Sequence, residues 1–140
     1  MKTLSFILRL IVSLILLQSL YFKFGGHAEA VHIFSTLGVE PWGRILLACL
    51  ELVVGVGLLF QKTYLKAAFG ATGLMVGAIG VHLFTAVGIE VMWEGTSDHG
   101  QLFTMALIAF VFSIAVQLIY ISKNELSIGT FVENEILKTR

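Results

Sequence analysis

Two ionisable residues interrupt long apolar stretches of the sequence, where a charged group is costly to place. Glu51 lies within the apolar run 43–60, and His82 lies within the run 65–89. Ionisable groups in hydrocarbon are rare and usually face a bundle interior or a cavity. A carboxyl can accept a proton there, and an imidazole can exchange one near neutral pH. This pair therefore predicts proton exchange with a bound polar group.

Other polar residues fall in the same half of their apolar runs. Counted from the outer ends of the runs, Glu51 should lie about 12 Å deep and His82 about 10 Å deep. Gln101 and Thr104 begin the last run on that side. The sequence predicts one polar pocket opening outward, with the candidate lining residues Gln18, Tyr21, Lys23, Glu51, His82 and Thr85.

Structural interpretations of the two buried groups stay open beside the functional one. Glu51 could form an ion pair with Lys23 or Arg44 that holds helices together, or its carboxyl could be kept neutral by desolvation. His82 could be an interior histidine hydrogen-bonded to Thr85, to Glu51 or to a backbone carbonyl.

The composition indicates which elements must position these side chains. Of 140 residues, 57% are hydrophobic and 13% charged, and the mean hydropathy is +0.93, which excludes a water-soluble core. A helix needs roughly 20 residues to cross the bilayer, and lipid offers no partner for an unpaired backbone amide. The fold class is therefore an all-α polytopic membrane protein, a bundle of four transmembrane helices at about 4–22, 43–60, 65–89 and 102–121.

Two segments lie outside these spans. Residues 27–37 have apolar side chains at the spacing of one helical face, which predicts a short interfacial helix before Gly38 and Pro41. Residues 1–121 would form the membrane domain, and the polar residues 122–140 a short cytoplasmic tail. A cleaved secretory signal is the alternative for the first run, but its length and Arg9 favour a permanent helix.

Lys and Arg are distributed unequally between the two sides of the predicted bundle. One side holds two of them, Lys23 and Arg44; the other holds seven, namely Lys2, Arg9, Lys62, Lys66, Lys123, Lys138 and Arg140. This asymmetry places both termini in the cytoplasm and the loops at 23–42 and 90–101 outside. The net charge of zero gives no support for nucleic-acid binding.

The residue types limit which cofactor the pocket could hold. A membrane haem needs two axial ligands at matching depth, and only His82 is placed inside, so haem is disfavoured. The spacing of His27 and His32 is not a zinc signature, and no metal site is predicted. The sole cysteine, Cys49, excludes thiol exchange within the chain. A quinone headgroup needs only a donor or a proton acceptor in an apolar slot, so it fits.

Glycine is concentrated in the third run. Gly70, Gly73, Gly77 and Gly80 fall on one side of a helical wheel, and Gly73 and Gly77 have the spacing of a close-approach motif. Because His82 lies about 180° from Gly73, we expect the glycines to face the rim of the bundle. They could receive a second protomer or another membrane protein, or pack against a helix of the same chain.

The order of these motifs resembles the DoxX family of small four-helix membrane proteins. The likeness covers roughly residues 5–120 and is carried by Arg9-Leu10, Lys23-Phe24, Gly38 with Pro41, Leu50-Glu51-Leu52, Gly55, Gly57, Met75, Ala78 and His82-Leu83. The small residue that the family usually has shortly before the Lys is absent in Leu20-Tyr21-Phe22-Lys23.

The resemblance implies a protein of the bacterial or archaeal inner membrane. Family members include the membrane subunit of a thiosulfate:quinone oxidoreductase and a partner in an assembly of superoxide and thiol defence. Carried over, Glu51 becomes a proton acceptor or charge partner, Lys23 its counter-ion, and His82 a donor to a bound headgroup. Two functions follow: a redox-linked subunit with a quinone pocket, or a non-catalytic scaffold that recruits membrane or periplasmic proteins. A proton-coupled transporter has less support, since no repeat is recognisable.

Overall fold

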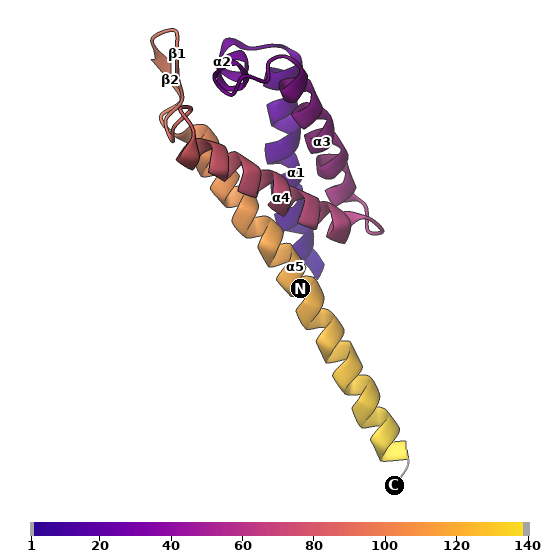
Figure 1. The fold of residues 1–140 in the computed structure, drawn as a ribbon. Coiled ribbons are helices and arrows are strands. Elements are labelled where there is room, and N and C mark those ends of the chain that lie inside the picture. The colour runs from indigo at the N-terminus through magenta and orange to yellow at the C-terminus, as the bar shows by residue number, and fades with distance from the viewer. Residues whose placement is uncertain (1, 139–140) are drawn as a thin grey trace.

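The chain forms five helices and one small hairpin within the part that the structure, a computed structural model, describes (Figure 1). The backbone is described for residues 2–138 and the side chains for residues 2–124. The elements are α1 (Lys2–Phe24), α2 (Ala28–Thr36), α3 (Trp42–Leu59), α4 (Tyr64–Phe84), β1 (Met92–Trp93), β2 (Thr96–Ser97) and α5 (Gln101–Lys138).

Four of these helices are long and apolar enough to cross a membrane: α1, α3, α4 and the part of α5 from Gln101 to Asn124. The expected four-helix membrane bundle is confirmed, and so is the short helix between the first two spans, which is α2. The expected boundary at residue 121 falls inside α5, whose backbone continues as one helix to Lys138. In Figure 1 its last turns project beyond the bundle.

The bundle has an apolar exterior, as a lipid environment requires. Large side chains more than half exposed lie on all four spans, among them Leu14, Val53, Phe69, Val111 and Leu118. The buried residues include, beside apolar ones, the polar residues Arg9, Ser13, Arg44, Glu51, His82, Ser113 and Gln117. Apolar side chains gain nothing by leaving lipid, whereas polar groups lower their free energy by bonding to each other inside.

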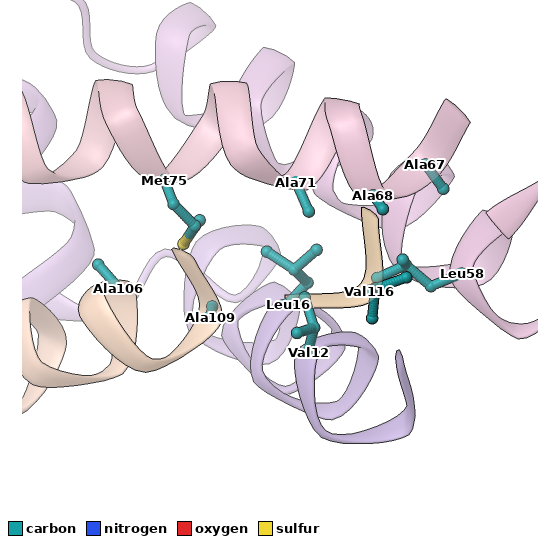
Figure 2. Close-up of a cluster of buried hydrophobic side chains, with 10 residues drawn as sticks. All are labelled: Val12, Leu16, Leu58, Ala67, Ala68, Ala71, Met75, Ala106, Ala109 and Val116. Carbon is teal, nitrogen blue, oxygen red and sulfur yellow. The ribbon is translucent and has the colours of Figure 1, made fainter. Parts of the chain in front are cut away.

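Small side chains let the helices approach closely at the centre of the bundle (Figure 2). Ala67, Ala68 and Ala71 of α4 pack with Leu16 of α1 and Val116 of α5 in one buried cluster. Packing of small residues at short range is a main source of helix association in membranes. The cluster joins α1, α3, α4 and α5 into one unit.

Polar bonds reinforce two of the helix pairs. Between α4 and α5, Gln117 Nε2 donates to Thr72 Oγ1 at 2.7 Å, and the Thr72 and Ser113 hydroxyls lie 2.8 Å apart. Between α1 and α3, Ser13 Oγ donates to the Gly55 carbonyl at 2.8 Å. Such bonds contribute about 0.6 kcal/mol each on average in membrane bundles.

α3 and α4 separate along their length, and this separation shapes the interior. A Cβ built at Gly57 would lie 3.1 Å from Ala67 Cβ, and one built at Gly70 would lie 3.0 Å from Val54 Cγ2. At Gly73 and Gly77, further along α4, a Cβ would meet no atom within 4 Å. The two helices therefore touch near the 60–63 turn and diverge toward the opposite end of the bundle. We call the end that contains the 60–63 turn and the start of α1 the terminal end, and the end that contains α2, β1 and β2 the hairpin end.

The third span ends five residues earlier than the sequence predicts, at Phe84 rather than Ile89. Thr85 Oγ1 donates to the Val81 carbonyl at 2.6 Å and accepts from Val87 N at 3.2 Å, which turns the chain. Gly88 follows with φ +73°, a conformation that glycine adopts without strain. His82 consequently lies in the last turn of α4, and Ile89, from which its expected depth of about 10 Å was counted, lies outside the helix.

The segment between α4 and α5 forms a β-hairpin that the sequence analysis treated as a loop. Met92 pairs with Ser97 and Trp93 with Thr96. The connecting residues Glu94 and Gly95 have φ values of 47° and 79°, as a two-residue hairpin turn with positive φ at both positions requires. The hairpin contacts α2, so these two elements together close the hairpin end of the bundle.

Candidate functional site

An ion pair connects α1 to α3 near the hairpin end. Lys23 Nζ lies 2.8 Å from Glu51 Oε2 and 3.1 Å from Oε1, and Ser19 Oγ donates to Oε2 at 2.6 Å. Ser19 and Lys23 are four residues apart on α1, so both face α3. The Lys23 and Glu51 side chains are 15% and 6% exposed. The Glu51 carboxylate thus accepts two hydrogen bonds from the Lys23 amine and one from the Ser19 hydroxyl, and it is almost fully buried.

Arg44, the other candidate partner for Glu51, is bound elsewhere. Its Nε donates to both oxygens of Glu40 at 3.0 Å, and Nη2 donates to Oε1 at 2.7 Å. Nη1 donates to the Lys23 carbonyl at the end of α1. Arg44 therefore fixes where α1 ends relative to α3, and in doing so positions the backbone from which the Lys23 side chain extends.

His82 is oriented by the backbone that follows α4. Its Nδ1 lies 2.6 Å from the Gly88 carbonyl, and its ring packs edge-on to Phe103 with centroids 5.7 Å apart. A carbonyl can only accept, so Nδ1 carries the hydrogen of this bond. In the neutral ring Nε2 is then an acceptor. His82 Nε2 is thus suited to accept a hydrogen bond, whereas the family resemblance implies a donor role for this residue.

A cavity of about 710 Å³ occupies the hairpin end, between α1 with α2 on one side and α4 with α5 on the other. Its volume lies in the range typical of small-molecule sites, about 300–1,000 Å³. Apolar side chains dominate its wall, including Ile33, Phe34, Leu74 and Leu102. The polar and ionisable lining residues are Gln18, Ser19, Lys23, Glu29, His82, Ser97, Asp98, His99 and Gln101.

Three of the predicted pocket residues line this cavity: Gln18, Lys23 and His82. Gln18 Nε2 donates to Met105 Sδ at 3.1 Å, and a thioether is a weak acceptor. This amide could exchange its present partner for a ligand carbonyl at small cost. Glu51 is not part of the lining and reaches the cavity through Lys23, which lines it.

The two remaining predicted pocket residues, Tyr21 and Thr85, do not line the cavity. Tyr21 is 70% exposed and packs against the rings of Phe22 and His27 on the outside of α1. Thr85 turns back onto α4. Counting residues along the apolar runs places both in the same half as the other candidates, yet Tyr21 lies on another face of α1 and Thr85 lies beyond the end of α4.

Two acidic residues at the cavity were missed by the sequence analysis. Asp98 accepts from the backbone amides of Val91, Gly100 and Leu102 at 2.7, 3.0 and 3.0 Å. Burial raises the pKa of Asp98, but these three bonds and the nearby His82 outweigh it, and the pKa is lower than its ordinary value. An acidic residue just before a helix often caps its N-terminus. The position of Asp98 before α5 is therefore a sequence feature that could have identified it.

Glu29 of α2 is the second such acid. Burial raises its pKa, and the charge of Asp98 raises it further, against the opposing effect of His27 and Lys23. The cavity is thus lined by one amine, Lys23, and by two acidic residues, Glu29 on α2 and Asp98 after β2. Nothing in the sequence indicates that α2 and the 90–100 segment fold over the same space.

The predicted glycine stripe divides between two environments. Gly70 packs against Val54 of α3 within the chain, whereas Gly73 and Gly77 line the cavity. Gly80, like these two, has no atom within 4 Å of a built Cβ. Gly73 and His82 border the same cavity although they lie on opposite sides of the wheel.

Within the described residues, no three His, Cys, Asp or Glu side chains converge as a metal site would require. No protein-family model, curated protein or solved structure matches the chain. The chemistry of the cavity therefore supplies the functional argument.

Proposed function

We propose that the protein is a DoxX-like membrane protein, a redox-linked subunit whose hairpin-end cavity binds a quinone or a similar small molecule. The observation that carries this proposal is the cavity itself, which combines an apolar wall with a few polar groups at one end. A quinone has the same division, with two carbonyls on a ring and an apolar tail. The electron-transfer partner would be a separate redox protein, since this chain needs only to bind the headgroup.

Each polar lining residue has a role that its present bonds allow. Lys23 and Gln18 supply hydrogen-bond donors for a quinone carbonyl, and Gln18 gives up only a sulfur acceptor to do so. His82 Nε2 would accept from a hydroxyl of the reduced form. Glu51 directs the Lys23 amine, as a positioning residue behind the cavity.

The proposed setting is the inner membrane of a bacterium or archaeon, with both termini in the cytoplasm. The excess of Lys and Arg at the terminal end supports this orientation. The cavity would then open near the periplasmic face, and the separation of α3 and α4 beside Gly73 and Gly77 would give a tail access from the bilayer.

Trp93 lines the cavity and offers a direct binding assay. In a Trp42→Phe background it is the remaining tryptophan of the chain, and a short-chain quinone should quench its fluorescence in nanodiscs. Lys23→Met should weaken binding about ten-fold, as expected for loss of one charge-assisted bond. Tyr21→Phe, which alters a residue on the outside of α1, is the matched control. Absence of saturable quenching in the parent protein would reject the quinone proposal.

A membrane scaffold is the second candidate function, and the length of α5 favours it. Among the residues whose side chains the structure describes, Gln101–Asn124 of this helix meets the requirements of a span, while the backbone continues to Lys138 and projects past the bundle (Figure 1). A projecting helix can serve as a docking element. Removal of residues after Asn124 should then abolish co-purification of a larger complex while leaving quinone quenching of Trp93 unchanged.

A further inference from the structure

A second cavity lies at the terminal end of the bundle, away from the proposed quinone site. Its volume is about 350 Å³. Residues of α1, of α5 and of the region around the 60–63 turn form its wall, namely Lys2, Ser5, Arg9, Gln61, Tyr64, Ile119, Tyr120 and Lys123. It shares no lining residue with the hairpin-end cavity, so a ligand here would be independent of the proposed function.

Arg9 is the central feature of this cavity. Its side chain is among the most buried of the chain, with the residue only 2% exposed. Its Nε and Nη1 atoms are buried without a hydrogen-bond partner among the described residues. An unsatisfied buried donor is costly, and a charged one more so. The guanidinium therefore has hydrogen-bonding capacity that a ligand could use.

Aromatic rings account for one part of the Arg9 environment. The guanidinium carbon lies 4.3 Å from the centroid of Tyr64 and 5.4 Å from that of Phe6. Cation–π contacts of this kind stabilise the charge and hold the side chain in place, but they do not satisfy N–H donors. The rings thus fix the orientation of the guanidinium and leave the N–H groups to another partner.

The charge of the lining indicates which partner fits. Lys2, Arg9 and Lys123 are cationic, and among the described residues the wall contains no carboxylate to balance them. Hydroxyl and amide groups from Ser5, Tyr64, Tyr120 and Gln61 complete the polar part of the wall. Arg and Lys together with hydroxyl donors are the usual ligands of phosphate oxygens.

We propose that this cavity binds a phosphate group, with Arg9 as the principal donor and Lys2 and Lys123 as flanking charges. The group could belong to the headgroup of an anionic phospholipid or to soluble phosphate, since the recognising chemistry is the same. Bound phosphate would supply the acceptor that the buried Nε and Nη1 atoms lack, and it would neutralise a cationic cluster that joins α1 to α5.

The two sources can be separated with purified protein in a neutral detergent. Phosphatidylglycerol and inorganic phosphate are titrated separately, with bound lipid followed by native mass spectrometry and stability by the melting temperature. Retention of phosphatidylglycerol with no response to inorganic phosphate assigns the site to a lipid headgroup, and a response to inorganic phosphate assigns it to the soluble ion. Either result supports a phosphate site, and absence of both responses overturns it.

Variants test whether Arg9 is responsible. Arg9→Gln should weaken phosphate-group binding at least about ten-fold, as loss of charge-assisted bonds predicts. Lys62→Gln removes a cation at the same end of the bundle that does not line the cavity, and it should leave binding unchanged. If Arg9→Gln does not fold, Lys123→Gln, an exposed position at the cavity mouth, should still weaken binding about three-fold. Equal losses in Lys62→Gln and in the cavity variants would show nonspecific charge attraction and refute the proposal.

Discussion

The ion pair between Lys23 and Glu51 gives an asymmetric prediction for mutation. Lys23→Met removes the amine and leaves the Glu51 carboxylate, with its side chain 6% exposed, held by Ser19 alone. Breaking a buried pair from one side costs about 3–5 kcal/mol, because an uncompensated charge remains. We expect Lys23→Met to lower the free energy of unfolding by an amount in this range.

The opposite single substitution should be milder. Glu51→Leu leaves the Lys23 amine unpaired, but this side chain is 15% exposed and lines an open cavity, so the amine can reach water. We expect a cost of about 1–3 kcal/mol for the lost bonds. The double variant replaces the pair by apolar groups of similar size, which is often close to neutral. Its cost should therefore be smaller than that of Lys23→Met alone.

A double-mutant cycle measures this coupling directly. Unfolding of the four proteins in mixed detergent micelles, followed by tryptophan fluorescence, gives the four free energies of unfolding. Because the double variant should cost less than Lys23→Met alone, the coupling energy should exceed the cost of Glu51→Leu, about 1–3 kcal/mol. If the two single costs simply add in the double variant, the pair makes no cooperative contribution and the reasoning from its burial is refuted.

Three further predictions concern the bundle and the hairpin. Gly55→Val should destabilise the bundle by about 1–3 kcal/mol, since a Cβ there would lie 2.9 Å from Leu17 Cδ2, and an unchanged denaturation midpoint would contradict this close packing. Gln117→Leu should cost only about 0.6–1.7 kcal/mol in the same assay, and a loss above 3 kcal/mol would show that the bonds of Gln117 to Thr72 and to the Ala68 carbonyl matter more than membrane hydrogen bonds usually do. Because the folded pKa of Asp98 lies below its ordinary 3.8, its stabilisation is present at neutral pH and is lost as the pH falls through the folded value. Amide exchange at Leu102, corrected for the intrinsic rate, should therefore accelerate on acidification in the parent protein but not in Asp98→Asn.

Much of the fold follows from the sequence because lipid restricts the choice of structure. A run of apolar residues as long as the bilayer must be helical, so the four spans are set by hydropathy, and the periodicity of residues 27–37 predicts α2. Ionisable residues within spans also stand out in the sequence, because placing such a group in hydrocarbon costs free energy. Glu51 was therefore recognisable in advance as a buried group, but Lys23 and Arg44 were both candidate partners, and the bonds of Arg44 to Glu40 and to the Lys23 carbonyl decide between them.

Local hydrogen bonds decided features that hydropathy cannot indicate. Thr85 and Gly88 end α4 before the apolar run ends. The carbonyl of Gly88 determines that Nδ1 of the His82 ring carries the hydrogen. Residues 85–89 are apolar enough to continue a span, so only the competing side-chain bond of Thr85 reveals the stop.

The relative tilt of the helices decided the remainder of the site. A helical wheel gives directions around one axis, but it contains no information on how far a neighbouring helix lies along each direction. α4 contacts α3 at Gly70 and is clear of packed atoms at Gly73 and Gly77, and this divergence opens the cavity that His82 and the glycines share. The residue types thus determined that polar groups would be buried in a membrane bundle. Tertiary packing determined which of them meet, because the space between helices depends on every contact along their length.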